Sequence, residues 1–225
     1  MSLHSRADGR PRRHDLVFVT PESWQALLAG RNDLQCHSIL APWIEKGWPL
    51  VGRRAMPGDA PGVPLGLPLP RSCGKRRLSF VVHPQDVRWI APPPALGAIS
   101  DVVPPTWLVT MDRLENAGLR HGVDIRVCGS LAWHALTRLD YVTEASDLDL
   151  LFYMSRETEV RGLTDDLAEI EAAAPMRLDG ELIREDGAAA NWRELHARAS
   201  EVLVKTVDGL ALLPQEAFFS MRERP

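Results

Sequence analysis

The amino-acid sequence predicts an α+β fold in two unlike lobes, the second built on a mixed sheet with flanking helices. Three observations support this prediction. Thirteen of the 18 prolines lie between Pro42 and Pro105, so the first part of the chain differs in composition from the rest. After Pro105, helical and strand patterns alternate and then give way to hairpin patterns. The 225 residues, 45% hydrophobic and 25% charged, suffice for one large or two small folded domains.

The first lobe, residues 1–104, is expected to be a small α+β unit. A helix should begin after Thr20, which has an N-cap side chain, with Pro21 at the first helical position. A second helix is expected over residues 33–46, interrupted at Pro42. Strands are expected at residues 16–19, 50–54 and 77–82.

A proline-rich segment covers residues 56–70, which hold five prolines and three glycines. Proline lacks a backbone donor and fixes φ, so this segment is predicted to be neither a helix interior nor a central strand. It is expected to form an extended loop or arm. Leu65, Leu67 and Leu69 recur at a spacing of two, which indicates that one side of the arm lies against other residues.

The second lobe, residues 105–225, shows clearer periodicity. Its first helix should end at Gly118 or Gly122. The last predicted hairpin turns on Asp208-Gly209. Helices are expected at residues 106–119, 131–139 and 157–173, strands at 123–128 and 147–153, and hairpins at 176–192 and 201–213. This order predicts a mixed sheet covered by helices.

Charge is unevenly distributed along the chain. The first 105 residues carry thirteen basic and eight acidic side chains, net +5, and the remainder carries thirteen basic and 22 acidic ones, net −9. This difference is expected if one lobe binds phosphates and the other binds a metal ion, although solvated surface acids also account for it. The overall charge of −4 and pI of about 6.0, with no long basic stripe, argue against nucleic-acid binding.

Membrane and secretory features are absent from the sequence. No apolar run approaches the roughly 20 residues that cross a bilayer, and the first residues lack the apolar region of a signal peptide. Cys36, Cys73 and Cys128 lie far apart, which argues against a disulfide framework and a zinc site. A cytoplasmic protein without membrane contact is therefore expected.

Two carboxylates, Asp147 and Asp149, lie at the start of a predicted strand. Side chains at i and i+2 of a strand point to the same face, about 7 Å apart, while Leu148 and Leu150 point to the other face. Two buried like charges are costly unless a cation lies between them. The pair is therefore a candidate Mg²⁺ site, with an exposed edge strand as the alternative.

Gly129-Ser130 lies where a predicted strand ends and a helix begins. Free backbone amides and the helix dipole at such a point favour phosphate oxygens, and glycine permits close approach. On its own, this dipeptide is more typical of a simple helix cap than of a phosphate site. A phosphate site followed by a carboxylate pair on the next strand is more specific than either motif.

The order strand, Gly-Ser, helix and Asp-x-Asp strand resembles the signature of the nucleotidyltransferase superfamily. The resemblance implies a third carboxylate on a later strand. Asp179 and Glu181 are the candidates for it, since they share a face of their predicted strand. Asp179 is favoured, and Glu181 stays open.

A more specific resemblance is to the malonate decarboxylase holo-acyl-carrier-protein synthases, which are phosphoribosyl-dephospho-CoA transferases. It extends over nearly the whole chain. The residues that carry it are Gly129-Ser130-Leu131-Ala132-Trp133, Tyr141, Ser146-Asp147-Leu148-Asp149-Leu150-Leu151, Arg13-His14-Asp15-Leu16, Gly66-Leu67-Pro68-Leu69-Pro70, Gly74-Lys75-Arg76-Arg77, Asp179-Gly180-Glu181 and Trp192-Arg193-Glu194.

The resemblance implies transfer of a prosthetic group from triphosphoribosyl-dephospho-CoA to a serine of the acyl carrier protein subunit of malonate decarboxylase, with release of pyrophosphate. Mg²⁺ would be held by Asp147, Asp149 and Asp179, with Glu181 as a further catalytic candidate. Gly129 and Ser130 would contact the phosphates. Further candidate phosphate-binding residues are Lys205, Lys75, Arg76 and Arg77.

These and other polar residues also have structural interpretations. Lys205 is typical of an edge-strand lysine, and residues 75–77 are typical of a solvated turn. His14 and His134 are more consistent with structural roles than with general bases, and Trp133 with core packing. Arg13 and Asp15 carry the family resemblance without an assigned role.

Three other functions fit the same motifs. A citrate lyase-type prosthetic-group transferase or an adenylyltransferase would use the same carboxylates on another substrate. A catalytically silent docking protein would keep only the fold, but the intact Asp147 and Asp149 argue against it.

Overall fold

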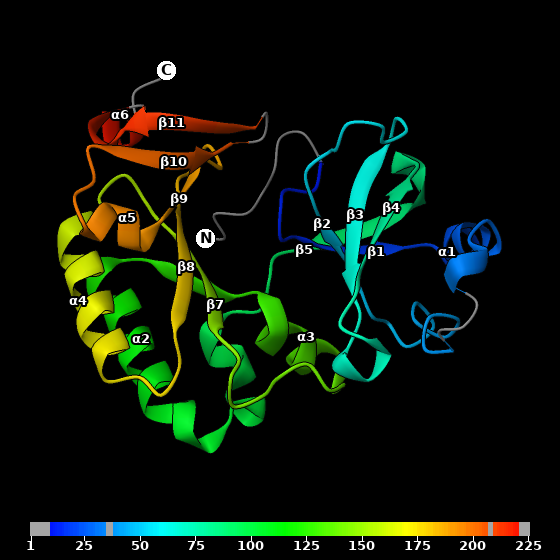
Figure 1. Ribbon diagram of the computed structural model, residues 1–225, viewed down its shortest axis with the longest axis horizontal. Coiled ribbons are helices and arrows are strands. Elements are labelled where there is room, and N and C mark those ends of the chain that lie inside the picture. The colour runs from blue at the N-terminus through cyan, green and yellow to red at the C-terminus, as the bar shows by residue number, and fades with distance from the viewer. Residues whose placement is uncertain (1–9, 35–37, 207–208, 221–225) are drawn as a thin grey trace. The chain divides into compact units, whose positions relative to one another are not determined.

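The computed structural model of the chain describes residues 10–34, 38–206 and 209–220. The chain forms two compact units, Met1–Pro93 and Pro94–Pro225, each with its own sheet and helices (Figure 1). The α+β fold expected from the sequence is confirmed. Residues 94–104 belong to the second unit, because Ala95 bridges to Arg126 and Leu96 and Ile99 lie in that unit's core.

The first unit contains a five-stranded antiparallel sheet in the order β4-β3-β2-β1-β5. Its elements are β1 (Leu16–Val19), α1 (Pro21–Ala29), β2 (Leu50–Gly52), β3 (Val63–Pro68), β4 (Arg77–Val82), β5 (Val87–Ala91) and short 3-10 turns at Asn32–Leu34, Arg71–Cys73 and Pro84–Asp86. The predicted cap of α1 is confirmed, since the Thr20 side chain accepts a hydrogen bond from the Ser23 amide at 3.3 Å. Trp24 of α1 is buried, and its Nε1 donates to the Leu40 carbonyl at 2.8 Å.

The prediction that residues 56–70 form only a loop or arm is wrong, because β3 lies inside the sheet between β4 and β2. The Arg53 amide donates to the Pro64 carbonyl. The edge of β3 on which Pro64 and Pro68 lack an amide N–H therefore faces β2. Strand β2 is short and pairs only with Leu65 and Gly66. The missing proline amides therefore fall where β2 offers no ladder partner, and proline is tolerated there.

The helix expected over residues 33–46 is also wrong where the chain is described, and residues 35–37 lie outside the described residues. Separate turns take its place, with hydrogen bonds from the Trp43 amide to the Leu40 carbonyl and from the Lys46 amide to the Pro42 carbonyl. Trp43 is fully buried, and its Nε1 donates to the Pro49 carbonyl at 3.0 Å. These separate turns, rather than one helix, bury the side chains of Leu34, Leu40 and Trp43.

The second unit contains a six-stranded mixed sheet in the order β11-β10-β9-β8-β7-β6. Strands β7 and β8 are parallel, and the other neighbours are antiparallel. The sheet is therefore mixed, as the sequence predicted. Its elements are α2 (Leu108–His121), β6 (Asp124–Val127), α3 (Gly129–Thr137), β7 (Leu148–Tyr153), α4 (Val160–Ala172), β8 (Leu178–Ile183), β9 (Ala189–Asn191), α5 (Trp192–His196), β10 (Glu201–Lys205), β11 (Leu210–Pro214), α6 (Gln215–Ser220) and 3-10 turns at Leu96–Val102 and Pro105–Trp107.

Local sequence patterns predicted most of these elements. Helix α2 ends at Gly122, which has a left-handed φ of +63°. Both predicted hairpins are present, although Asp208 in the second turn lies outside the described residues. Strand β5 and helix α6 were not predicted from the sequence. Within the described ranges, no helix has the length and apolar character to cross a membrane.

One face of the six-stranded sheet forms the core of the second unit. Leu148, Leu150 and Phe152 of β7 point to this face and are buried with residues of α2 and α4. Helices α2 and α4 pack against each other on this side of the sheet (Figure 1). The alternate residues of the same strands therefore lie on the opposite face, where the polar residues gather.

Gly180 leaves no room for a side chain on the buried face of β8. A Cβ atom there would lie 2.5 Å from Cε2 of Phe152 and 3.1 Å from Cδ1 of Trp192. We expect Gly180→Ala to lower the free energy of unfolding by about 1–3 kcal/mol through overpacking. Urea denaturation checks this, and a variant as stable as the wild type would contradict the tight packing.

Candidate active site

The structure places two of the predicted carboxylates opposite each other. In the parallel register of β7 and β8, Asp149 pairs directly with Asp179. Residues in register share a face of the sheet, and neighbouring strands lie about 4.8 Å apart. Asp149 is half-buried and the Asp179 side chain is 46% exposed, so solvent can reach both carboxylates. They lie on the face of the sheet opposite α2 and α4, hereafter the open face. Asp147 lies one residue before β7 and is exposed.

Gly129 lies directly against Asp149. The Cys128 amide donates to the Asp149 carbonyl at 3.0 Å, which holds the start of α3 beside β7. Gly129 has a left-handed φ of +62°, and a Cβ atom there would lie only 1.8 Å from Oδ2 of Asp149. Both the backbone conformation and the close approach require glycine.

Helix α3 begins at Gly129, and Cys128 at its N-cap makes no side-chain capping hydrogen bond. The first amides of a helix have no partner within the helix, and they form the positive end of its dipole. Ser130, which is half-buried in this first turn, adds a hydroxyl donor. The Gly129-Ser130 backbone is therefore suited to hold phosphate oxygens next to the Asp149 carboxylate.

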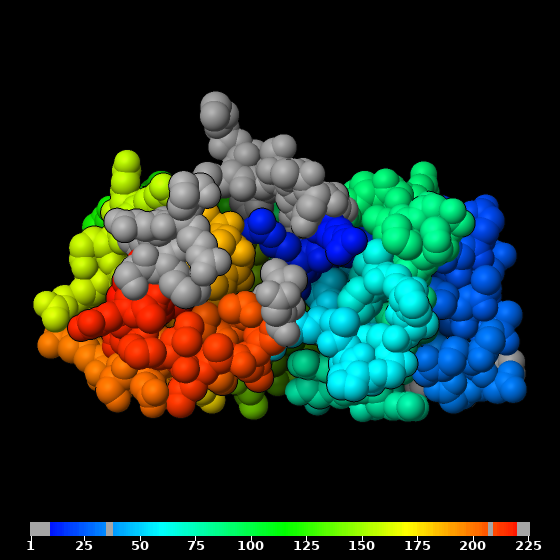
Figure 2. Space-filling model, turned by 90° about the horizontal axis from the view of Figure 1, so that it is seen from above, coloured from blue at the N-terminus to red at the C-terminus, as the bar shows by residue number. Residues whose placement is uncertain are grey.

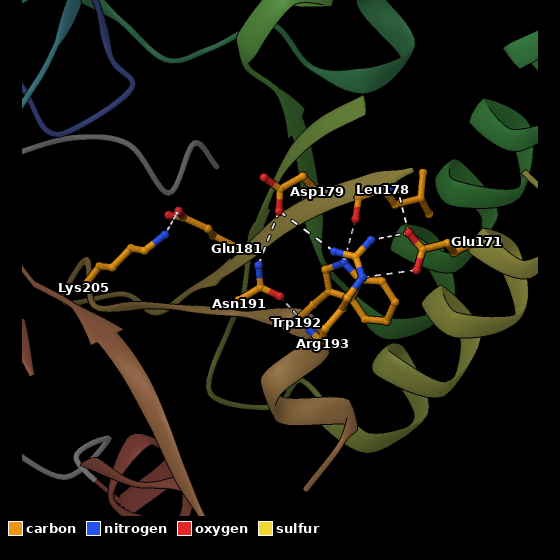
Figure 3. Close-up of polar contacts among 8 residues, drawn as sticks. All are labelled: Glu171, Leu178, Asp179, Glu181, Asn191, Trp192, Arg193 and Lys205. Carbon is orange, nitrogen blue, oxygen red and sulfur yellow. Dashed lines mark hydrogen bonds and ion pairs between the residues drawn. The ribbon is translucent and has the colours of Figure 1, made fainter. Parts of the chain in front are cut away.

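Asp179 is flanked by groups from β9 and α5 (Figure 3). Nδ2 of Asn191 donates to Oδ1 of Asp179 at 3.3 Å, and Nη1 of Arg193 lies 4.0 Å from the same oxygen. On its other side, Arg193 forms a bidentate ion pair with Glu171 of α4. Asp179 is therefore the carboxylate at which the polar contacts of β8, β9 and α5 converge.

Glu181 is in a different environment from Asp179. It lies opposite Leu151 in the register of β7 and β8, and Nζ of Lys205 donates to its Oε1 at 2.5 Å (Figure 3). Its side chain is only 12% exposed. Lys205, a candidate phosphate ligand from the sequence, thus neutralises Glu181 in this structure.

The donor set suits a magnesium ion that is shared with a substrate. Asp147, Asp149 and Asp179 offer hard carboxylate oxygens, the ligands that Mg²⁺ prefers. Among the described residues, no three His, Cys, Asp or Glu side chains converge into a closed metal site. Mg²⁺ commonly keeps one or two carboxylates and takes its other ligands from phosphates and water. The residues therefore fit an ion that binds together with a phosphate group.

The remaining sequence candidates belong to other elements of the chain. Lys75, Arg76 and Arg77 are exposed in the first unit, around the start of β4. Trp133 is buried, and Nδ1 of His134 lies 2.7 Å from the Leu139 carbonyl at the end of α3, so both have structural roles as expected.

Asp15 is buried in the first unit and has a local role in the turn before β1. Its carboxylate accepts a hydrogen bond from the Arg12 amide at 2.5 Å. The Asp15 carbonyl also accepts from the Gly52 amide at 2.8 Å, next to the pairing of β1 with β2. These contacts connect the Arg13-His14-Asp15 segment to the sheet of the first unit.

The open face continues from the carboxylates onto β10 and β11. Leu203, Leu210 and Leu212 lie on this face and remain 36%, 59% and 60% exposed. Figure 2 shows the orange and red segments of these strands at the surface. The open face therefore combines an acidic part on β7 and β8 with an apolar part at the sheet edge.

Two pockets lie away from this face. One of about 540 Å³ lies between α4, α5 and α6, and another of about 300 Å³ lies between α2 and α4. At the second pocket, Oδ2 of Asp166 lies 2.7 Å from Nη2 of Arg120 and 2.8 Å from Nε2 of His121. Hydrogen bonds from Arg120, and to a lesser extent from His121, lower the pKa of Asp166. This ion-pair cluster joins α2 to α4. None of the sequence-predicted site residues that the structure describes lines either pocket.

Sequence reasoning missed the roles of Asn191, Arg193 and Glu171 around Asp179. Asn191 could have been found from the sequence as a helix-capping residue type. In the structure its side chain caps α5 by accepting a hydrogen bond from the Arg193 amide at 2.9 Å. The register of the β8–β9 hairpin pairs Asn191 with Glu181, and this pairing places Asn191 on the open face. Glu171 lies on another element, so no local pattern connects it to the site.

Comparison with known proteins assigns this chain to a family. Models of the phosphoribosyl-dephospho-CoA transferase MdcG N-terminal and C-terminal domains match residues 12–93 and 95–216. A phosphoribosyl-dephospho-CoA transferase of Bradyrhizobium diazoefficiens is 52% identical over 213 residues, 95% of this chain and 94% of that protein. One from Xanthomonas campestris is 37% identical over 212 residues, 93% and 97% of the two chains. No solved structure matches significantly. The chain therefore belongs to the phosphoribosyl-dephospho-CoA transferases, and it is a transferase enzyme.

Proposed function

We propose that this enzyme transfers 2′-(5″-phosphoribosyl)-3′-dephospho-CoA from its triphosphate precursor to a serine of the malonate decarboxylase acyl carrier protein. The observation that carries the proposal is the pairing of Asp149 with Asp179 beside Gly129-Ser130. This arrangement provides anionic oxygens for a metal ion and backbone donors for phosphates within one site. Family membership supports the phosphoribosyl-dephospho-CoA group as the part that is transferred.

The proposed reaction is a phosphoryl substitution. The serine hydroxyl oxygen forms a bond to the first phosphorus of the triphosphate, the one attached to the phosphoribosyl 5″ oxygen. The bond from that phosphorus to the pyrophosphate oxygen breaks. The hydroxyl proton passes to a carboxylate or to solvent, and the product is a phosphodiester. Asp179 is better placed than Glu181 to receive the proton, since Glu181 is paired with Lys205.

Each residue of the site has a defined part in this proposal. Asp149 and Asp179 would hold Mg²⁺, with the exposed Asp147 as a further candidate ligand just before β7. The ion would supply neutralisation of charge on the triphosphate. The Gly129 and Ser130 amides would orient the terminal phosphates beside Asp149 at the start of β7. Catalysis then depends on positioning and electrostatics, without a protein nucleophile.

Weighing the carrier protein tests the function. The full chain is incubated with Mg²⁺, the apo carrier protein and triphosphoribosyl-dephospho-CoA, and the carrier is measured by intact-protein mass spectrometry. We expect a mass gain equal to one phosphoribosyl-dephospho-CoA group, because the attacking serine retains that group and loses only its proton. A carrier whose acceptor serine is replaced by alanine should gain no mass.

Parallel reactions separate the alternative functions. A gain of AMP when ATP is the donor would favour an adenylyltransferase. Faster loading of the citrate lyase carrier than of the malonate decarboxylase carrier would change the proposed partner but keep the chemistry. If no donor changed the mass of either carrier, the transfer reaction proposed here would be refuted.

A further inference from the structure

Arg193 lies between two carboxylates that belong to different elements (Figure 3). Its Nε donates to Oε2 of Glu171 at 3.2 Å, and its Nη2 pairs closely with Oε1 of the same residue. Its Nη1 is directed toward Asp179, with 4.0 Å between Nη1 and Oδ1. One guanidinium thus connects the C-terminal end of α4 with the open-face carboxylate of β8.

The Arg193 Nη1 atom is buried and has no hydrogen-bond partner among the described residues. A buried donor without a partner is costly, so its nearest acceptor is significant. Within the described part of the chain, Oδ1 of Asp179 accepts one hydrogen bond, from Nδ2 of Asn191 at 3.3 Å, so the carboxylate has capacity for a second donor. A small movement of the carboxylate toward Nη1 would satisfy both groups.

Arg193 itself is held rigidly. Its guanidinium lies over the Trp192 ring at 4.8 Å, and Nε1 of Trp192 donates to the Leu178 carbonyl at 3.1 Å. Oε1 of Glu171 also accepts from the Leu178 amide at 2.9 Å. Both backbone groups of the residue before Asp179 are therefore connected to the surroundings of Arg193. This arrangement determines where β8 presents Asp179.

We propose that Arg193 is the positioning residue of Asp179, orienting its carboxylate opposite Asp149 for binding of the divalent ion. The inference rests on the proposed function, in which Asp179 is the third carboxylate. Arg193 acts through Asp179 and does not contact the substrate, because its one uncommitted nitrogen is buried. Its other two nitrogens, Nε and Nη2, each donate a hydrogen bond to Glu171.

Metal binding and turnover of Arg193→Met test this role in the full-length enzyme. We expect the dissociation constant of Mn²⁺, used as a probe for Mg²⁺ and measured by calorimetry, to rise about 10- to 100-fold. The kcat of carrier loading should fall by a similar factor, while KM for triphosphoribosyl-dephospho-CoA changes less than about threefold. A direct phosphate contact would instead raise KM and leave the Mn²⁺ affinity unchanged, and that result would overturn the inference.

Arg184→Met is a matched control for loss of a packed guanidinium. Arg184 also pairs with an acid, Asp186, and lies 5.5 Å from the centre of the Phe218 ring, but it follows the opposite end of β8. We expect this control to lower the melting temperature while Mn²⁺ affinity and kcat stay within about twofold. Equal losses of metal affinity in both variants would show a general structural effect and contradict a specific role for Arg193.

A double-mutant cycle with Asp179→Asn keeps the test valid if Arg193→Met is also less stable. Once Asp179 is asparagine, adding Arg193→Met should weaken Mn²⁺ binding by no more than about twofold further. A full additional loss would show that Arg193 acts independently of Asp179. If the wild type neither binds Mn²⁺ nor loads the carrier, the proposed function fails as well. Unchanged Mn²⁺ affinity in Arg193→Met alone overturns only this inference.

Discussion

Replacing Asp149 by asparagine is expected to lower the rate of carrier loading by about 10³-fold, which corresponds to about 4 kcal/mol of transition-state stabilisation. The amide has the shape of the carboxylate but lacks its negative charge. Asp149 is half-buried against Gly129 and opposite Asp179, so the charge acts where the metal and phosphates would meet. Initial rates from the mass of the loaded carrier measure the effect.

Asp124→Asn provides the matched control for this substitution. Asp124 lies on β6, on the same face of the sheet but opposite Tyr153, and it pairs with Arg126 at 2.9 Å. We expect this control to load the carrier within about threefold of the wild-type rate. An Asp149→Asn enzyme that melts like the wild type and keeps a tenth or more of its activity would contradict the assignment of the metal site.

Gly129→Ala is expected to reduce carrier loading by more than about 100-fold. A left-handed conformation costs an alanine about 1–2 kcal/mol, and the new Cβ atom would overlap the Asp149 carboxylate at 1.8 Å. Either α3 or Asp149 must move, which separates the phosphate-binding amides from the carboxylate. A displacement of about 1 Å between catalytic groups can lower a rate about 100-fold, and the overlap requires a movement of at least that order.

Gly122→Ala separates the two causes. Gly122 has a nearly identical φ of +63°, but no atom of the described residues beyond its own chain neighbours lies within 4 Å of its Cβ position. This control should therefore lose about 1–2 kcal/mol of stability in urea denaturation and keep its activity. If Gly129→Ala and Gly122→Ala behaved alike in both measurements, the close contact with Asp149 would have no functional importance.

The secondary structure was predictable wherever the signal was local. The Thr20 cap, the Gly122 helix end and the strand patterns of β7 and β8 each depend on neighbouring residues, and the structure contains them all. The assignment of residues 56–70 to an arm failed for a different reason. A proline excludes a central strand only if a neighbour needs its amide, and the short β2 does not.

The sequence by itself predicted that a helix begins near Gly129-Ser130 and singled out Asp147 and Asp149 as candidate ligands, because each lies within a few residues of one strand end. It left Asp179 and Glu181 as alternatives, since residues two apart share a face of any strand. Only the tertiary structure separates them. The register of β7 and β8 places Asp179 opposite Asp149, and Lys205 from β10 neutralises Glu181. Strand register and ion pairs between distant elements arise from packing of the whole sheet, which no local pattern encodes.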